Sequence, residues 1–322
     1  MSEESASVGA ERAGRGRVGL ALLVAWATVS SSAVFIVWAA PVPPLAIAAG
    51  REGITALAWA FIALAGARRA RSSSAALPAG TGLSARRVGL RLAISGVLLG
   101  AHFAGWVGSL SLTTVTHAAV FVSIQPLFAG LFGLFIGDRF TWRLAAGVAV
   151  AVAGSIAMAG GGHAGDGVSP SLEGDLVAVG AAAAGALYLS VNRGLAGSVR
   201  LPVLLAWVNA VATLTIAAAV LASGGEWWHP DARWEREGLA ILWLGLAPGL
   251  LGHGLMNWSA RHVPVHVVTV AFLLEPVGAA LLALALLGQS IGWPEVLGAA
   301  LLLHGAALVS KSTGRPAEAG EG

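Results

Sequence analysis

Long apolar runs without a charged residue dominate the sequence. They cover residues 18–50, 92–137, 144–165, 176–192, 201–225 and 238–260, and further apolar stretches follow residue 261. A helix that crosses a bilayer needs about 20 predominantly apolar residues, so the longest runs hold two helices each. The first run breaks at the prolines that follow Ala40, because proline has no backbone N–H and stops a helix. The pattern predicts an all-α integral membrane protein with ten transmembrane helices, at residues 18–38, 43–66, 90–108, 114–136, 143–160, 174–192, 201–222, 238–257, 264–287 and 292–310.

Composition agrees with a membrane protein and excludes other classes. Hydrophobic residues make up 57% of the 322 residues and charged residues 11%, with a mean hydropathy of +0.79. Soluble domains carry about 25% charged residues, so this chain has too few to cover a water-soluble surface. The net charge of +3 comes without a basic stripe, which argues against a nucleic-acid partner. Cysteine is absent, so disulfides and thiolate sites are excluded, and no metal ion or cofactor is expected.

Basic residues concentrate in the loops on one side of the predicted helices. With a cytoplasmic N-terminus, the inside segments hold all 19 basic residues except Arg51, Arg233 and Arg236. Lys and Arg accumulate in the cytoplasmic loops of membrane proteins. We therefore expect a multi-pass protein of the cell (inner or plasma) membrane, with cytoplasmic tails at residues 1–17 and 311–322. The first helix follows three arginines, as a signal peptide would, but spans continue after it and we interpret it as retained.

The two halves of the chain resemble each other at a spacing of about 150 residues. The matched positions are Trp106 with Trp258, Gln125–Pro126 with Glu275–Pro276, and Trp142 and Gly147 with Trp293 and Gly298. The repeat holds five helices, over residues 18–158 and 174–310. Because five is odd, the two copies enter the membrane from opposite sides. The result is an inverted repeat, the architecture by which one site faces the two sides of a membrane alternately.

These residues resemble the EamA-type members of the drug/metabolite transporter superfamily. The resemblance rests on Pro44-Leu-Ala-Ile-Ala-Ala-Gly-Arg51, on residues 111–119 leading to Gln125-Pro126-Leu127, and on Leu274-Glu275-Pro276-Val277. It covers two EamA repeats of five helices. It implies a secondary active transporter that exports a small organic metabolite, such as an amino acid, with protons as a candidate coupling ion.

Two ionisable residues lie within the second predicted helix. Arg51 and Glu52 are about 12 Å from its start at about 1.5 Å per residue, and an ionisable group inside a span costs roughly 2.5–3.5 kcal/mol. Adjacent helical residues point about 100° apart, so we do not expect these two to pair. The sequence leaves two roles open for Arg51. It binds an anion or carboxylate in a cavity, or it joins helices through a salt bridge or carbonyl groups.

Glu275 lies at a proline break in the middle of the ninth predicted helix. Pro276 leaves the carbonyl of Phe272 without its helical hydrogen bond, and Gln125–Pro126 makes the corresponding break in the fourth helix. Such breaks are tolerated where they line a cavity or are buried in protein. Glu275 is therefore a candidate for proton coupling. The alternative is a protonated carboxyl that bonds to a neighbouring helix.

Other polar residues share helix faces across the repeat. His102 and Trp106 are four residues apart, as are His253 and Asn257 in the equivalent helix, and Tyr188 and Asn192 in the sixth. A membrane histidine can also serve only as an interhelical hydrogen-bond partner, worth about 0.6 kcal/mol on average. We predict a central cavity between the repeats, with these candidate substrate or coupling residues: Arg51, His102, Trp106, Gln125, Tyr188, Asn192, His253, Asn257, Trp258 and Glu275.

Transport by alternating access through this cavity is the leading hypothesis, with a small-molecule metabolite and the lipid bilayer as partners. Two alternatives come from other classes. A rhomboid-like intramembrane protease would use the His-x-x-x-Asn of His253 and Asn257, but the Gly-x-Ser-Gly nucleophile motif is missing. A scaffold without transport activity would gain little from costly residues such as Arg51 and Glu275. The chain also has no GxxxxGK[ST] motif of a P-loop ATPase, and we do not expect an enzyme.

Overall fold

The computed structural model describes residues 3–72, 84–109, 112–113, 121–122, 124–136, 141–160, 171–287 and 291–311, and helices are its regular elements. In chain order these are α1 (Glu3–Ser30), α2 (Ser32–Ala39), α3 (Pro44–Ser72), α4 (Ala85–Ser109), α6 (Gln125–Gly133), the short η1 (Leu134–Ile136), α7 (Trp142–Gly160), α8 (Leu172–Arg193), α9 (Leu201–Ala222), η2 (Trp234–Gly238), α10 (Leu239–Leu244), η3 (Gly245–His253), α11 (Gly254–Ser259), α12 (Val265–Val268), α13 (Val270–Leu273), α14 (Glu275–Leu287) and α15 (Trp293–Lys311). The all-helical class is confirmed for the described residues.

Among the described residues, six helical stretches are long and apolar enough to cross a membrane. They are Gly16–Ala39, Pro44–Arg69, Ala85–Ser109, Leu172–Arg193, Leu201–Ala222 and Trp234–Ser259, and each overlaps a predicted span. Shorter apolar helices cover Trp142–Ala157, Glu275–Leu286 and Val296–Val309. The first part of the predicted span 114–136 lies outside the described residues. Large apolar side chains cover the outer surface, for example Leu57, Phe61 and Phe135, as expected for helices that face lipid.

The predicted break at Glu275 is present, but the ninth segment is more broken than the sequence indicated. Residues 264–287 were expected to form one helix, and the structure divides them into α12, α13 and α14 at Thr269 and Leu274. Pro276 lies in the first turn of α14, where its missing N–H interrupts the helix. The indole of Trp26 on α1 donates to the carbonyl of Leu274 at 2.8 Å, in addition to the backbone bonds that this carbonyl accepts from Val277 and Gly278, and so ties α1 to the break. The matching pair, Gln125–Pro126, likewise begins a helix, α6.

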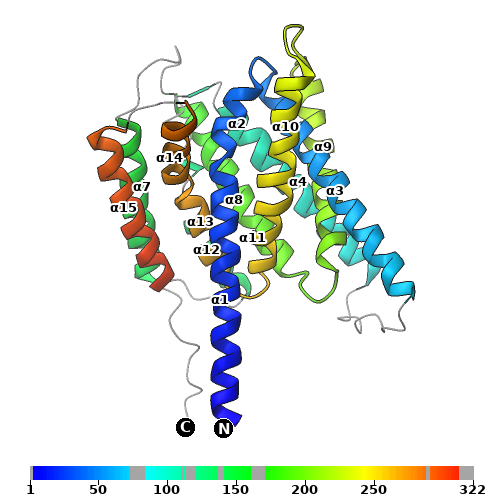
Figure 1. The fold of residues 1–322 in the computed structure, drawn as a ribbon, viewed down its shortest axis with the longest axis vertical. Coiled ribbons are helices and arrows are strands. Elements are labelled where there is room, and N and C mark those ends of the chain that lie inside the picture. Colours follow the sequence, from blue (N-terminus) through cyan, green and yellow to red (C-terminus); the bar gives the residue numbers. More distant parts are fainter. Residues whose placement is uncertain are drawn as a thin grey trace.

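In Figure 1, α7, α14 and α15 form a smaller group beside a larger one, and a further apolar core joins α2, α3 and α10 through residues such as Ala39, Ile47 and Ile241. The larger group surrounds α1 and α8, and its apolar core includes Leu99, Leu189, Leu204 and Met256. The smaller core joins α7 and α15 to the ninth segment through residues such as Leu144, Leu273 and Leu302. In Figure 1, α1 begins and α15 ends at the same end of the molecule.

Candidate functional site

A buried ion pair on α3 lies at the centre of the polar residues. Arg51 is 4% exposed and Glu52 1%, and Arg51 Nε lies 3.3 Å from Glu52 Oε1. The expectation that these adjacent residues do not pair is therefore wrong. The backbone directions differ as helix geometry requires, but the arginine side chain is long enough to bend back toward its neighbour.

Aromatic rings lie near the Arg51 guanidinium. Its Cζ lies 4.3 Å from the centroid of the Phe103 ring on α4, a cation–π distance. The Phe103 ring also contacts the rings of His102, at 5.0 Å, and His253 on η3, at 5.6 Å. Phe272 on α13 also contacts the His253 ring, with centroids 5.6 Å apart. Four rings from α4, η3 and α13 thus form a connected chain of contacts, and one of them, Phe103, lies on the Arg51 guanidinium.

Glu275 at the start of α14 belongs to the same neighbourhood. Its carboxyl interacts electrostatically with Arg51, and it is partly exposed, whereas Glu52 is sealed. One guanidinium therefore has two carboxyl groups near it, one of them accessible and one enclosed.

His102 and Gln125 meet against Gly185 of α8. The His102 Nδ1 lies 2.8 Å from the carbonyl oxygen of Ala181. A Cβ at position 185 would lie 2.7 Å from His102 Nδ1 and 3.0 Å from Gln125 Nε2. Only glycine leaves room here for the two polar side chains, which come from α4 and α6.

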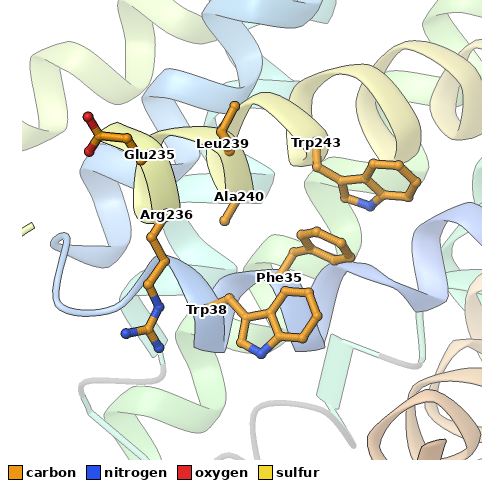
Figure 2. Close-up of a pocket in the computed structure, with 7 residues that line it drawn as sticks. All are labelled: Phe35, Trp38, Glu235, Arg236, Leu239, Ala240 and Trp243. Carbon is orange, nitrogen blue, oxygen red and sulfur yellow. The ribbon is translucent and has the colours of Figure 1, made fainter. Parts of the chain in front are cut away.

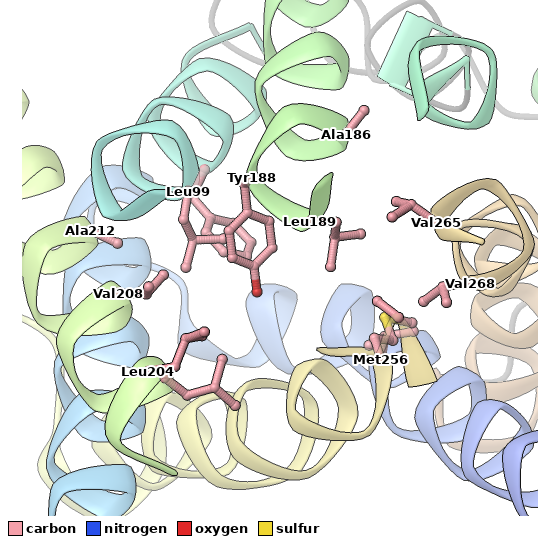
Figure 3. Packing of buried hydrophobic residues seen from close by; sticks show 14 of the residues in the cluster. Leu99, Ala186, Tyr188, Leu189, Leu204, Val208, Ala212, Met256, Val265 and Val268 are labelled. Atoms are coloured by element: carbon pink, nitrogen blue, oxygen red, sulfur yellow. The ribbon is translucent and has the colours of Figure 1, made fainter. Parts of the chain in front are cut away.

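Three of the predicted residues bond to one another instead of pointing into open space. Asn192 Nδ2 donates to Asn257 Oδ1 at 2.7 Å, and Asn257 Nδ2 donates to the Tyr188 hydroxyl and, at 2.9 Å, to the carbonyl of His253. Ser95 Oγ donates to Asn192 Oδ1 at 2.6 Å. All four side chains are buried, so this amide network joins α4, α8 and α11 within the larger core. Figure 3 shows Tyr188 in the middle of that core, among Leu99, Leu189 and Val208.

The two predicted tryptophans make different contacts. Trp106 on α4 is partly buried and packs on the larger apolar core. Trp258 on α11 lies against the His262 ring, with centroids 4.4 Å apart. The structure thus brings Arg51, His102, His253 and Glu275 to one neighbourhood and places these tryptophans in other surroundings.

Sequence reasoning missed Ser95, Phe103 and Phe272 and gave Glu52 no role. Ser95 lies seven residues before His102, about two helical turns, so the shared face was a usable signal. For the two phenylalanines there was no signal, because apolar residues fill these helices.

Two cavities lie away from this cluster. One of about 380 Å³ is lined by Phe35 and Trp38 of α2 and by Glu235, Arg236, Leu239, Ala240 and Trp243 of the η2–α10 segment (Figure 2). The other, about 310 Å³, is an apolar space between α14 and α15. The Arg51 cluster is packed and closed, so the central cavity stays a prediction. Within the described residues, no group of three His, Cys, Asp or Glu side chains could hold a metal ion.

Comparisons with known proteins find a transporter family and a relative described as an exporter. The model of the EamA-like transporter family matches residues 172–311. A protein from Streptantibioticus cattleyicolor described as a probable terminal-alkyne amino-acid exporter is 27% identical, covering 91% of this chain and 96% of that protein. A solved crystal structure covers 92% of this chain and 97% of its own, with a TM-score of 0.70 and 22% identity, which is a likeness of fold.

Proposed function

We propose that this chain, a membrane protein whose residues 172–311 are an EamA-like transporter domain, exports a small organic metabolite by secondary active transport. The family match and the exporter relative confirm the resemblance to EamA-type transporters and point to a transporter, not an enzyme. The observation that carries the mechanism is the buried Arg51 cluster. Groups of this kind are costly inside a membrane and mark substrate or ion pathways. We place the protein in the cell membrane with both termini in the cytoplasm.

The proposed architecture is ten spans in two inverted repeats. In chain order the spans are α1–α2, α3, α4, α6 and α7, followed by α8, α9, η2–α11, α12–α14 and α15. The helix contacts support this, because the most extensively packed pairs have counterparts when the halves are exchanged. Thus α4 packs on α8 while η3 and α11 pack on α1, and α4 packs on α9 while η3 packs on α3. In each of the pairs α7–α15, α3–α9 and α6–α12, the two helices hold equivalent positions in the proposed halves, so exchanging the halves gives the same pair again.

Glycines between α7 and α15 support the same symmetry. A Cβ at Gly147 would lie 2.8 Å from the carbonyl oxygen of Gly305, and one at Gly154 would lie 2.7 Å from that of Gly298. The repeat that aligns Gly147 with Gly298 also aligns Gly154 with Gly305, so the two contacts exchange with each other. Gly147, which comes earlier in α7, meets Gly305, which comes later in α15, whereas Gly154 meets the earlier Gly298. The two helices are therefore antiparallel. A two-fold axis between antiparallel spans lies in the membrane plane, as an inverted repeat requires.

In the proposed mechanism the substrate binds between the two halves and is exposed to each side in turn. The cluster of Arg51, His102, His253 and Glu275 draws on α3, α4, η3 and α14, which belong to both halves. Gln125, Trp106, Tyr188, Asn192, Asn257 and Trp258 complete the proposed cavity in its open states. The amide network of Asn192 and Asn257 lies at the ends of α8 and α11 that we assign to the cytoplasmic side, so it must open to admit substrate. Glu275, the accessible carboxyl beside Arg51, is the proposed proton carrier.

Transport assays in proteoliposomes test this proposal. The purified full chain is supplied with a panel of small metabolites that includes neutral amino acids, because the relative is described as an amino-acid exporter. We expect Arg51→Ala to lower the flux at least tenfold, and Glu275→Gln to remove its dependence on a pH gradient. Glu237→Gln is the matched control, since Glu237 is another buried carboxyl and bonds locally to the backbone N–H of Arg233 at 2.7 Å.

Unchanged flux in both site variants, with folded protein, would overturn the mechanism. Flux that keeps its pH-gradient dependence in Glu275→Gln would remove only the proton role. Absence of flux for every metabolite with the wild-type chain would contradict the transport function.

A further inference from the structure

Three buried polar atoms of the Arg51–Glu52 pair have no hydrogen-bond partner among the described residues. They are Nε and Nη2 of Arg51 and Oε2 of Glu52. The nearby amide network shows the opposite behaviour, since the side chains of Asn192 and Asn257 bond to each other. Buried polar groups in native proteins are satisfied with few exceptions, and an exception calls for an explanation such as an absent ligand. Here the exceptions are two donors and one acceptor, side by side.

The two donors form one edge of the guanidinium. Nε–H and the adjacent Nη2–H point in the same direction and match the two oxygens of a carboxylate. The face of the guanidinium is covered by the Phe103 ring at 4.3 Å, which holds its plane and leaves this edge for binding. Glu52 Oε1 lies 3.3 Å from Nε, yet neither donor has a hydrogen bond. Glu52 therefore neutralises the guanidinium as an ion-pair partner without forming a hydrogen bond with either edge donor.

The unpartnered acceptor lies next to this edge. Glu52 is 1% exposed, and its Oε2 faces no donor within the described part of the chain. A carboxylate oxygen in this position suits a cationic group such as an ammonium, with which it forms a charge-assisted hydrogen bond. Because the two residues are consecutive, a site for an anion and a site for a cation lie directly beside each other.

We propose that Arg51 and Glu52 together recognise the zwitterionic head of an α-amino acid. The substrate carboxylate binds the Nε–Nη2 edge of Arg51, and its ammonium group binds Glu52 Oε2. Both groups of an α-amino acid are attached to the same carbon, so its charges are as close together as the two binding groups. This inference rests on the proposed function and assigns the ammonium to Glu52, leaving Glu275 for the proton. The head enters when the two halves separate, since the pair is enclosed in the present conformation.

Ligand series on the purified full chain test this assignment. Neutral L-amino acids, L-norvaline among them, are compared with the acid that lacks the amino group (pentanoate) and the amine that lacks the carboxylate (n-butylamine). Dissociation constants are measured by calorimetry in detergent. We expect the wild-type chain to bind the best amino acid at least tenfold more tightly than either partial ligand.

Two variants test the ammonium site and the carboxylate site separately. Glu52→Gln should weaken amino-acid binding at least tenfold while pentanoate binding is kept, so that the preference for the amino group disappears. Arg51→Lys should weaken binding of the amino acid and of pentanoate while n-butylamine binding is kept. Glu237→Gln should leave all three constants unchanged, because that carboxyl lies outside the site. A misfolded variant would lose every ligand, so a selective loss separates recognition from folding.

Three results would overturn the assignment. The first is a Glu52→Gln chain that still prefers the amino acid over pentanoate. The second is a wild-type chain that binds the amino acid no better than the partial ligands, a result that does not depend on whether any variant folds. The third is a wild-type chain that transports another metabolite but binds no neutral amino acid, in which case the proposed transport function stands and only the head-group assignment fails.

Discussion

At the scale of single residues, the buried polar groups divide into two kinds. The side chains of Ser95, Asn192, Asn257 and Tyr188 bond to one another and hold three helices together. Atoms of Arg51 and Glu52 stay without hydrogen-bond partners although both residues are buried. Satisfied groups stabilise a packed state, and unsatisfied ones lower its stability. On this difference rests our proposal that the first kind holds the closed conformation together and that the second kind binds substrate.

Replacement of Asn257 tests the structural kind. Asn257→Ala removes the acceptor of Asn192 and the donor to Tyr188, which leaves buried polar groups without partners. We expect the free energy of unfolding to fall by about 1–3 kcal/mol, measured by denaturant unfolding in detergent. Ser190→Ala is the matched control, because the Ser190 hydroxyl donates only to the carbonyl of Ala186 in its own helix, at 2.9 Å. Equal losses in the two variants would contradict the role of the network.

At the scale of helices, close approach and backbone breaks shape the molecule. Glycines let α7 and α15 pack with their backbones in contact, as small residues do at helix interfaces in membranes. Elsewhere a proline alters the helix itself. Pro248 lies inside η3, a segment with the wider π-helical turn, which accommodates a residue that lacks the N–H donor. The hydroxyl of Thr55 donates to the carbonyl of Gly245 at 2.8 Å and ties this segment to α3.

Alanine substitutions at two glycines test the packing of α7 on α15. Gly154→Ala would place its Cβ 2.7 Å from the carbonyl oxygen of Gly298 and 2.8 Å from the backbone N of Leu302, and backbone atoms cannot move aside easily. We expect a loss of about 1–3 kcal/mol in the free energy of unfolding from overpacking. Gly180→Ala, where nothing lies within 4 Å, should gain up to about 1 kcal/mol from helix propensity. Thermal unfolding in detergent measures both, and a Gly154→Ala chain as stable as the wild type would contradict the close contact.

At the scale of the whole molecule, symmetry and orientation connect the fold with transport. The helix contacts of one half recur in the other, and α1 begins at the end of the molecule where α15 finishes (Figure 1). In the alternating-access mechanism that we propose, two similar halves packed in opposite directions have two conformations of similar energy, each open to one side. The proposed site draws on α3, α4, η3 and α14, so in this proposal both conformations reach it.

Cysteine labelling tests the orientation of the protein in the membrane. Because the chain has no cysteine, a single introduced cysteine is the only one that can be labelled. Glu226 lies exposed between α9 and η2, and Arg69 lies exposed near the end of α3. We expect a membrane-impermeant maleimide to label Glu226→Cys in intact cells and Arg69→Cys only after permeabilisation, because positive charge marks the cytoplasmic side. The reverse pattern would place the termini outside.

The apolar runs predicted where helices lie, and the prolines predicted where they break. Each apolar span candidate overlaps a predicted range, and Gln125 and Glu275 each begin a helix as expected. These features depend on local chemistry, namely the transfer of apolar side chains into lipid and the missing N–H of proline. The additional break at Thr269 was not predictable in the same way, because no proline follows it in the next turn.

By itself, the sequence determined the membrane class, the ranges of the six apolar span candidates and the set of costly polar residues. Only the tertiary structure decided which of those residues meet. It paired Arg51 with Glu52, bonded Asn192 to Asn257, and placed Phe103 on the guanidinium. The physical reason is range: hydropathy and proline geometry act within one helix, whereas the partner of a buried side chain depends on which distant helix packs beside it and on how far a flexible side chain can bend.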